Sequence, residues 1–154
     1  MRGCRDFRTA VNAALRLLRV RQRSQKEIIS RLRQKGYEQS VVNKVVAYLR
    51  DTGYLDDREF ARLWIDSCKN KSFGFRRIIQ ELKQKGISQD IIDVALRESA
   101  KDYNEAEVAQ ALLEKRLSRM GHLKRDVVQR RLYSFLIRRG FHPEVVTEIV
   151  SKIK

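Results

Sequence analysis

Hydrophobic residues recur along the chain with a helical spacing, and one block of this pattern occurs three times. The segments KEIISRLRQKGYEQSVVNKVV (26–46), RRIIQELKQKGISQDIIDVAL (76–96) and RRLYSFLIRRGFHPEVVTEIV (130–150) align without a gap. In each block, two apolar stripes with a period of three to four residues flank a glycine at the same position, namely Gly36, Gly86 and Gly140. This spacing predicts two amphipathic helices, joined at a glycine in the left-handed conformation that ends many helices.

A further amphipathic segment precedes each block, so each repeat contains three predicted helices. These segments are residues 11–18, 60–65 and 108–113. We therefore predict an all-α fold of about nine helices, arranged as three tandem three-helix repeats over residues 1–53, 54–100 and 101–154. Because each repeat of such an array contacts mainly its neighbours, we expect an elongated molecule.

Polar residues at the predicted helix starts support this division. Residue pairs that fit a capping box satisfy the free N–H groups of a first helical turn. The pairs are Ser24 with Glu27, Asp56 with Glu59, and Asn104 with Glu107. We also expect Ser88 to cap one helix and Pro143 to occupy the first position of the last helix.

Composition excludes several other classes of protein. The 154 residues are 42% hydrophobic, which is enough for a packed core. One proline and seven glycines are too few for the many turns of an all-β fold. No apolar run approaches the roughly 20 residues that cross a bilayer, and two cysteines cannot form a disulfide framework. We expect a monomeric protein of the cytoplasm that does not bind membranes.

The sequence offers little for catalysis. Cys4, Cys68, His122 and His142 are the only cysteines and histidines, and none has the spacing of a metal site. The glycines form no phosphate-binding loop. We interpret the acidic pair that begins at Asp56 as a helix cap, and Cys68 as a core or boundary residue. We predict no enzymatic activity, metal or cofactor.

The charge of the chain indicates a polyanionic partner. The formal net charge is +15, of which residues 1–53 carry +9, residues 54–100 carry +1 and residues 101–154 carry +5. A field of this sign attracts nucleic acid, an anionic membrane or an acidic protein. The membrane is the weakest of these, because no segment combines a basic face with a free apolar face.

Some basic residues occupy positions that we interpret as binding positions. Three share one repeat position near the predicted start of the middle helix, where a cation opposes the helix dipole and folding alone does not explain it. A second cluster, of arginines, lies on the first predicted helix and in the loop after it. The candidate partner-binding or nucleic-acid-binding residues are Arg16, Arg19, Arg21, Arg23, Lys26, Arg76, Arg77, Arg130 and Arg131. By contrast, Lys35, Lys85 and Arg139 lie at predicted helix C-termini, where a cation is favourable.

Three aromatic residues could in principle stack on nucleic-acid bases. Trp64 lies on a predicted core face, so we expect it to be buried. Phe73 and Phe75 precede Arg76, and they fit either a contact loop or a hydrophobic staple at a helix start.

Four segments carry a pattern more specific than the repeat. They are AALRLL (13–18) followed by S-x-x-E-x-x-x-x-L-x-x-K-G-Y (24–37), L-x-x-x-G-Y-L-D-D-x-x-F-A (49–61), G-x-x-R-I-x-x-E-L-x-x-K-G-I (74–87) and L-Y-x-F-L-x-R-R-G-F (132–141). The second is the most discriminating, because helical periodicity alone would not produce it. Over about residues 13 to 150, the chain resembles the RecX family of bacterial recombination regulators, although Phe75 stands where members often carry proline.

The resemblance implies a non-enzymatic modulator, mainly an inhibitor, of the RecA recombinase. Such proteins lie in the groove of the RecA–DNA filament and suppress strand exchange, ATP turnover and co-protease activity. Two alternatives remain open. One is an autonomous nucleic-acid-binding protein with helix-turn-helix units, although Glu38 and Asp90 near the predicted helix starts would repel phosphate. The other is a protein adaptor whose charge serves solubility or an acidic partner.

Overall fold

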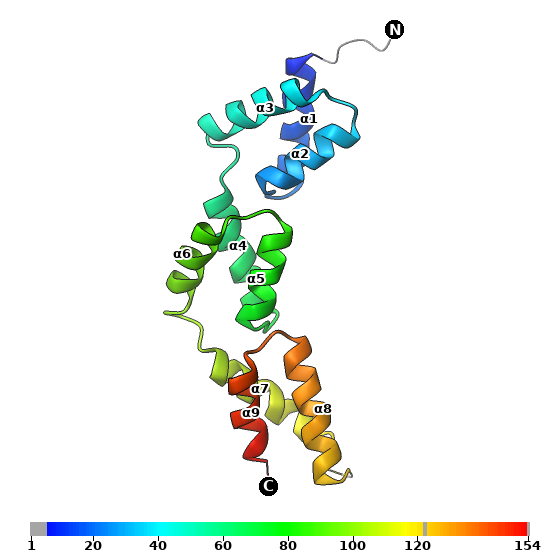
Figure 1. Ribbon diagram of the computed structural model, residues 1–154, viewed down its shortest axis with the longest axis vertical. Coiled ribbons are helices and arrows are strands. Elements are labelled where there is room, and N and C mark those ends of the chain that lie inside the picture. The colour runs from blue at the N-terminus through cyan, green and yellow to red at the C-terminus, as the bar shows by residue number, and fades with distance from the viewer. Residues whose placement is uncertain (1–5, 122, 154) are drawn as a thin grey trace.

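The chain folds as an elongated row of α-helices. The computed structural model describes residues 6–121 and 123–153, and these form nine helices and no strand (Figure 1). The helices are α1 (Phe7–Val20), α2 (Gln25–Gln34), α3 (Gln39–Asp51), α4 (Asp57–Asn70), α5 (Phe75–Gln84), α6 (Gln89–Ser99), α7 (Glu105–Leu117), α8 (Arg125–Arg138) and α9 (Pro143–Ser151).

The helices form three units of three, and each unit has its own hydrophobic core. We call α1–α3 unit 1, α4–α6 unit 2 and α7–α9 unit 3. The buried apolar residues separate into three clusters, one for each unit. The units follow one another from the N-terminal to the C-terminal end of the molecule (Figure 1). The all-α, elongated three-repeat fold that the sequence predicts is therefore confirmed.

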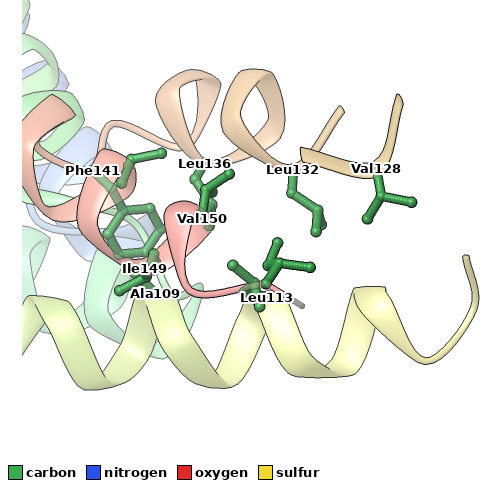
Figure 2. Close-up of a cluster of buried hydrophobic side chains, with 10 residues drawn as sticks. Ala109, Leu113, Val128, Leu132, Leu136, Phe141, Ile149 and Val150 are labelled. Carbon is green, nitrogen blue, oxygen red and sulfur yellow. The ribbon is translucent and has the colours of Figure 1, made fainter. Parts of the chain in front are cut away.

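Unit 3 shows how one such core is built. Its three helices direct apolar side chains toward a common interior, in which Phe141, Leu136 and Leu132 are fully buried (Figure 2). Ala109 and Leu113 reach the same interior from α7. The small alanine lets α7 approach Phe141, which follows the turn glycine of this repeat.

The turn glycines have the conformation that the sequence predicts. The φ angles of Gly36, Gly86 and Gly140 are 83°, 80° and 86°. In unit 2 the amide of Gly86 donates to the carbonyl of Lys83 at 2.9 Å, and the amide of Ile87 donates to that of Leu82 at 3.1 Å. This pair of bonds is the Schellman motif. It turns the chain from α5 into α6 and places Ile87 in the core.

The helix caps agree only in part with expectation. Ser24 and Glu27 form a complete capping box, and Pro143 occupies the first turn of α9. Asp56 and Asn104 each accept from two backbone amides. The reciprocal half of the Asp56 box is absent, because the carboxylate of its partner at position 59 binds an arginine instead. The prediction for Ser88 is wrong, since its side chain makes no cap hydrogen bond.

Unit 3 differs from the other two in the length of its middle helix. The helix α8 has 14 residues, whereas α2 and α5 have 10 each. The additional residues lie at the N-terminal end, because the turn glycines align. Arg130 and Arg131 therefore lie in the middle of α8, and the prediction that they lie near a helix start is wrong. Within the described part of the chain, no helix is long and apolar enough to cross a membrane.

Candidate polyanion interface

The middle helices of the three units follow one another end to end. The start of α2 lies against the turn at the end of α5, and the start of α5 lies against the turn at the end of α8. Together α2, α5 and α8 form a row along one side of the molecule, which we call the column (Figure 1). Since the N-terminus of one helix meets the C-terminus of the next, the helix dipoles of the column are aligned head to tail.

Polar side chains make the junction between units 1 and 2. The hydroxyl of Ser24 donates to the carbonyl of Lys85 at 2.6 Å, and the Lys26 ammonium donates to the carbonyl of Gln84 at 3.1 Å. The backbone amide of Gln25 donates to the Asp57 carboxylate at 2.9 Å. Lys26 therefore binds the carbonyl end of α5, where a cation is favourable. The interpretation that folding does not explain a cation at this position is wrong for Lys26.

Backbone hydrogen bonds contribute to the junction between units 2 and 3, in addition to side-chain bonds. The amide of Gly74 donates to the carbonyl of Arg139 at 3.0 Å, and the amide of Arg76 donates to that of Gly140 at 3.1 Å. Arg77 packs its backbone against Gly140, so folding explains part of its placement as well. Its guanidinium pairs with Glu81 at 2.9 Å.

A groove runs across each junction on the column. The first groove lies between units 1 and 2, has a volume of about 390 Å³, and is rich in cations. It is lined by Arg21, Arg23, Lys26, Glu27, Ser30, Arg31, Gln34, Gln84 and Lys85. The guanidinium and ammonium groups in this groove outnumber the single carboxylate, so it is suited to a polyanion.

The second groove lies between units 2 and 3 and has a volume of about 580 Å³. It is lined by Arg76, Arg77, Gln80, Glu81, Gln84, Ile137, Arg138 and Gly140. Arg76 and Arg138 are exposed and take part in no ion pair among the described residues. Both side chains are therefore available to an incoming anion, for which arginine offers bidentate contacts.

The carboxylate of Glu27 is the electrostatic centre of the first groove. It accepts hydrogen bonds from Arg21 at 2.9 and 3.2 Å and forms an ion pair with Lys85 at 2.7 Å. Burial alone would raise the pKa of this carboxyl, but the bonds from Arg21 and Lys85 outweigh burial and lower the pKa to about 2. Glu27 is therefore ionised at neutral pH and ties units 1 and 2 together.

The aromatic residues near the second junction pack within the protein. Phe73 lies under the guanidinium of Arg77, whose central carbon is 3.8 Å from the ring centroid, and Phe75 makes an edge contact with Tyr103. Both rings are half-buried against the unit 2 core. Of the two interpretations that the sequence left open, packing at the helix start fits this arrangement.

Trp64 is half-buried, and its surroundings are more polar than those of a core residue. Its indole N–H donates to the Glu81 carboxylate at 3.1 Å, and the ammonium of Lys85 lies 4.7 Å from the ring centroid.

Cys68 is a buried core residue, as the sequence predicts. Burial and the nearby Glu81 carboxylate raise the pKa of its thiol to about 12. The thiol is therefore protonated and inert at neutral pH. Cys4 and His122 lie outside the described residues.

The structure divides the candidate binding residues into two groups and adds a third group of basic residues. Arg21, Arg23, Lys26, Arg76 and Arg77 line the two grooves. The remaining candidates are exposed on helices outside the groove linings, and they are Arg16, Arg19, Arg130 and Arg131. The third group consists of groove residues that sequence reasoning did not select, namely Arg31, Lys85 and Arg138. These residues line a groove only because two units meet end to end, which the sequence does not show. The repeat alignment indicates only that Lys85 precedes a turn glycine.

A groove of different character lies between α4 and α6. It has a volume of about 390 Å³, and its lining includes four carboxylates and two guanidinium groups, with Val94 among its apolar residues. These carboxylates belong to Asp56, Glu59, Asp90 and Glu98. The carboxylate-rich surface of unit 2 is therefore separate from the basic grooves of the column.

Fold and surface together define a tandem helical-repeat protein with a basic face along one row of helices. Its sequence matches three family models: the first three-helix domain of RecX over residues 10–49, the second over residues 56–96 and the third over residues 103–150. A "Regulatory protein RecX" of Prosthecochloris aestuarii is 35% identical over 151 residues, covering 96% of this chain and 95% of that protein. The chain belongs to the RecX family, whose curated members are named as regulatory proteins.

Other relatives agree with this assignment. A "Regulatory protein RecX" of Clostridium beijerinckii is 27% identical over 150 residues, which are 96% of this chain and 70% of that protein. The crystal structure of RecX from Lactobacillus salivarius superposes with a TM-score of 0.83 over 95% of each chain, at 24% sequence identity. This last likeness concerns the fold.

Proposed function

We propose that this protein regulates the RecA recombinase by lying along the RecA–DNA filament with its column facing the filament. It acts without catalysis, as a monomer, and mainly as an inhibitor of ATP turnover and strand exchange. The family assignment supports RecA as the partner, because the curated relatives are named regulatory protein RecX.

The observation that carries the proposal is the pair of basic grooves on the column. They occur at both junctions of an elongated molecule, and each holds cations from two neighbouring units. A filament that contains DNA presents a long polyanionic surface, and cations spaced along a rod can engage such a surface at several points. The exposed arginines of α1 and α8 extend the same basic character beyond the grooves.

The second candidate function, an autonomous DNA reader of the helix-turn-helix kind, finds less support. The third helix of unit 1 begins after Glu38, and that of unit 2 carries Asp90 in its first turn. Carboxylates at these positions repel the phosphates that flank a recognition helix in the major groove.

The experiment is a titration of this protein into RecA filaments on single-stranded DNA, with ATP turnover as the readout. We expect inhibition at amounts well below one molecule per RecA subunit, because one elongated molecule spans several subunits. Unchanged ATP turnover at a large excess of this protein would refute the proposal.

A further inference from the structure

The two grooves of the column are equivalent by the repeat, yet their charged side chains are arranged differently. Lys26 in the first groove corresponds to Arg76 in the second, and Ser30 corresponds to Gln80. The residue after Lys26 is Glu27, whereas the residue after Arg76 is Arg77. The first groove thus has a carboxylate at position 27 and a cation at position 31, whereas the second has a cation at position 77 and a carboxylate at position 81.

The ion pairs of the two grooves also connect different parts of the molecule. Glu27 joins Arg21 of unit 1 to Lys85 of unit 2. In the second groove the carboxylate of Glu81 pairs with Arg77, four residues earlier on the same helix. An anion that competes for Arg21 and Lys85 therefore weakens a contact between units, whereas an anion that competes for Arg77 weakens a contact within one helix.

The junctions differ in the same sense. The hydrogen bonds described above between units 1 and 2 use side chains, such as the bond from Ser24 to the carbonyl of Lys85. Units 2 and 3 also share a side-chain bond, from the amide of Phe75 to the Glu105 carboxylate at 2.8 Å. They are joined in addition by backbone hydrogen bonds at Gly74 and Arg76, and the contacts described above for the first junction include no equivalent of these. Arg139, which corresponds to Lys85, donates to the backbone carbonyl at position 71 at 2.6 Å rather than to a carboxylate. Because the ion pair of Glu27 with Lys85 joins units 1 and 2, the first junction is the one that an anion can open.

We propose that the second groove is the standing phosphate-binding groove, and that Glu27 closes the first. A phosphodiester enters the first groove by displacing the Glu27 carboxylate from Arg21 and Lys85, and this displacement frees unit 1 to move relative to units 2 and 3. The ligand is the sugar–phosphate backbone of nucleic acid, and the inference rests on the proposed function of the column. Strand binding and junction opening are linked, so binding of the strand favours the open junction. By reciprocity, a change that opens the junction raises the affinity for the strand.

The test compares Glu27→Gln with Glu59→Gln. Both changes remove one negative charge, but the Glu59 carboxylate lies on α4 and pairs with Arg62. Glutamine also serves in a capping box, so Glu27→Gln retains the cap of α2. We expect Glu27→Gln to bind a short oligothymidylate about two- to fivefold more tightly than the wild type, the fold-change that corresponds to an exposed ion pair. We expect less than about a twofold change for Glu59→Gln, because an exposed, distant charge is screened.

A second readout measures the junction directly. Spin labels at the exposed positions Ser40 and Arg97 report the distance between units 1 and 2, and labels at Arg97 and Ser118 report units 2 and 3. We expect the first distance distribution to broaden in Glu27→Gln without nucleic acid, and in the wild type when oligothymidylate is added, while the second stays unchanged. A Glu27→Gln variant with wild-type affinity and wild-type distances would overturn the inference. The outcome of this test is separable from that of the RecA assay. If the junction opens as expected but the protein leaves RecA unaffected, only the proposed function is refuted.

Discussion

The substitution Gly74→Ala tests the junction between units 2 and 3 without straining the backbone. Gly74 has φ −73° and ψ 158°, which alanine adopts freely. A methyl group at this position would overlap the carbonyl of Gly140 and the amide of Phe141, and both are backbone groups that cannot rotate away. The two units must therefore separate or the loop must distort.

The cost of Gly74→Ala follows from what the overlap disturbs. Forcing an extra methyl into a packed contact costs about 1–3 kcal/mol. The backbone hydrogen bonds from Gly74 to Arg139 and from Arg76 to Gly140 are lost or lengthened, at about 1 kcal/mol each. The reduced freedom of the unfolded chain returns about 0.4–1 kcal/mol. We expect a net loss of about 2–4 kcal/mol.

The assay is urea denaturation followed by two signals. Trp64 is the only tryptophan and reports unit 2 by fluorescence, while circular dichroism reports all helices. We expect the Trp64 transition of Gly74→Ala to move to lower urea and to separate from the circular dichroism transition, because unit 2 loses the support of unit 3. Gly121→Ala is the matched control, since a methyl group there meets nothing within 4 Å. Wild-type transitions in Gly74→Ala would refute the junction described above.

Further predictions concern Cys68, Glu27 and Gly86. In a Cys4→Ser background, we expect Cys68 to resist a thiol-specific reagent in the folded protein and to react in urea, because the pKa of its thiol is raised to about 12; rapid labelling without urea would contradict its burial. The pKa of Glu27 is about 2 in the folded protein against an ordinary 4.5, so its stabilisation is present above pH 4.5 and is lost as the pH falls toward 2. The difference in urea midpoint between wild type and Glu27→Gln should therefore be constant near neutral pH and shrink on acidification, and a constant difference down to pH 2 would contradict this pKa. We expect Gly86→Val to cost more than about 1 kcal/mol in thermal denaturation, because a β-branched residue is strained at φ 80°; an unchanged melting temperature would contradict that strain.

The helices and turns of this protein could be predicted from the sequence because they depend on local patterns. The apolar stripes around Leu32, Leu82 and Leu136 repeat at a helical spacing, and all three residues are fully buried. The residue between the stripes is a glycine because it adopts the left-handed backbone conformation that ends the first helix of each pair. These features need only the sequence and elementary stereochemistry.

The junctions could not be predicted, because they depend on how one unit meets the next. Lys85 has the sequence position of an ordinary C-terminal cation, and only the end-to-end approach of α2 brings Glu27 to within 2.7 Å of it. The sequence of α2 alone indicates no folding role for Lys26, because it does not show the carbonyl end of α5 to which Lys26 donates. Arg138 joins the second groove for the same reason.

The most direct test of the central claim compares charge reversals on and off the column. The double variant Arg76→Glu and Arg138→Glu alters two exposed cations of the second groove, whereas Lys44→Glu and Arg97→Glu alters two exposed cations on α3 and α6 by the same net charge. Each is titrated into RecA filaments on single-stranded DNA, after circular dichroism has confirmed its fold. We predict that the groove variant loses most of the inhibition of ATP turnover and that the control retains it. Equal inhibition by the two folded variants would contradict the claim that the column is the regulatory face.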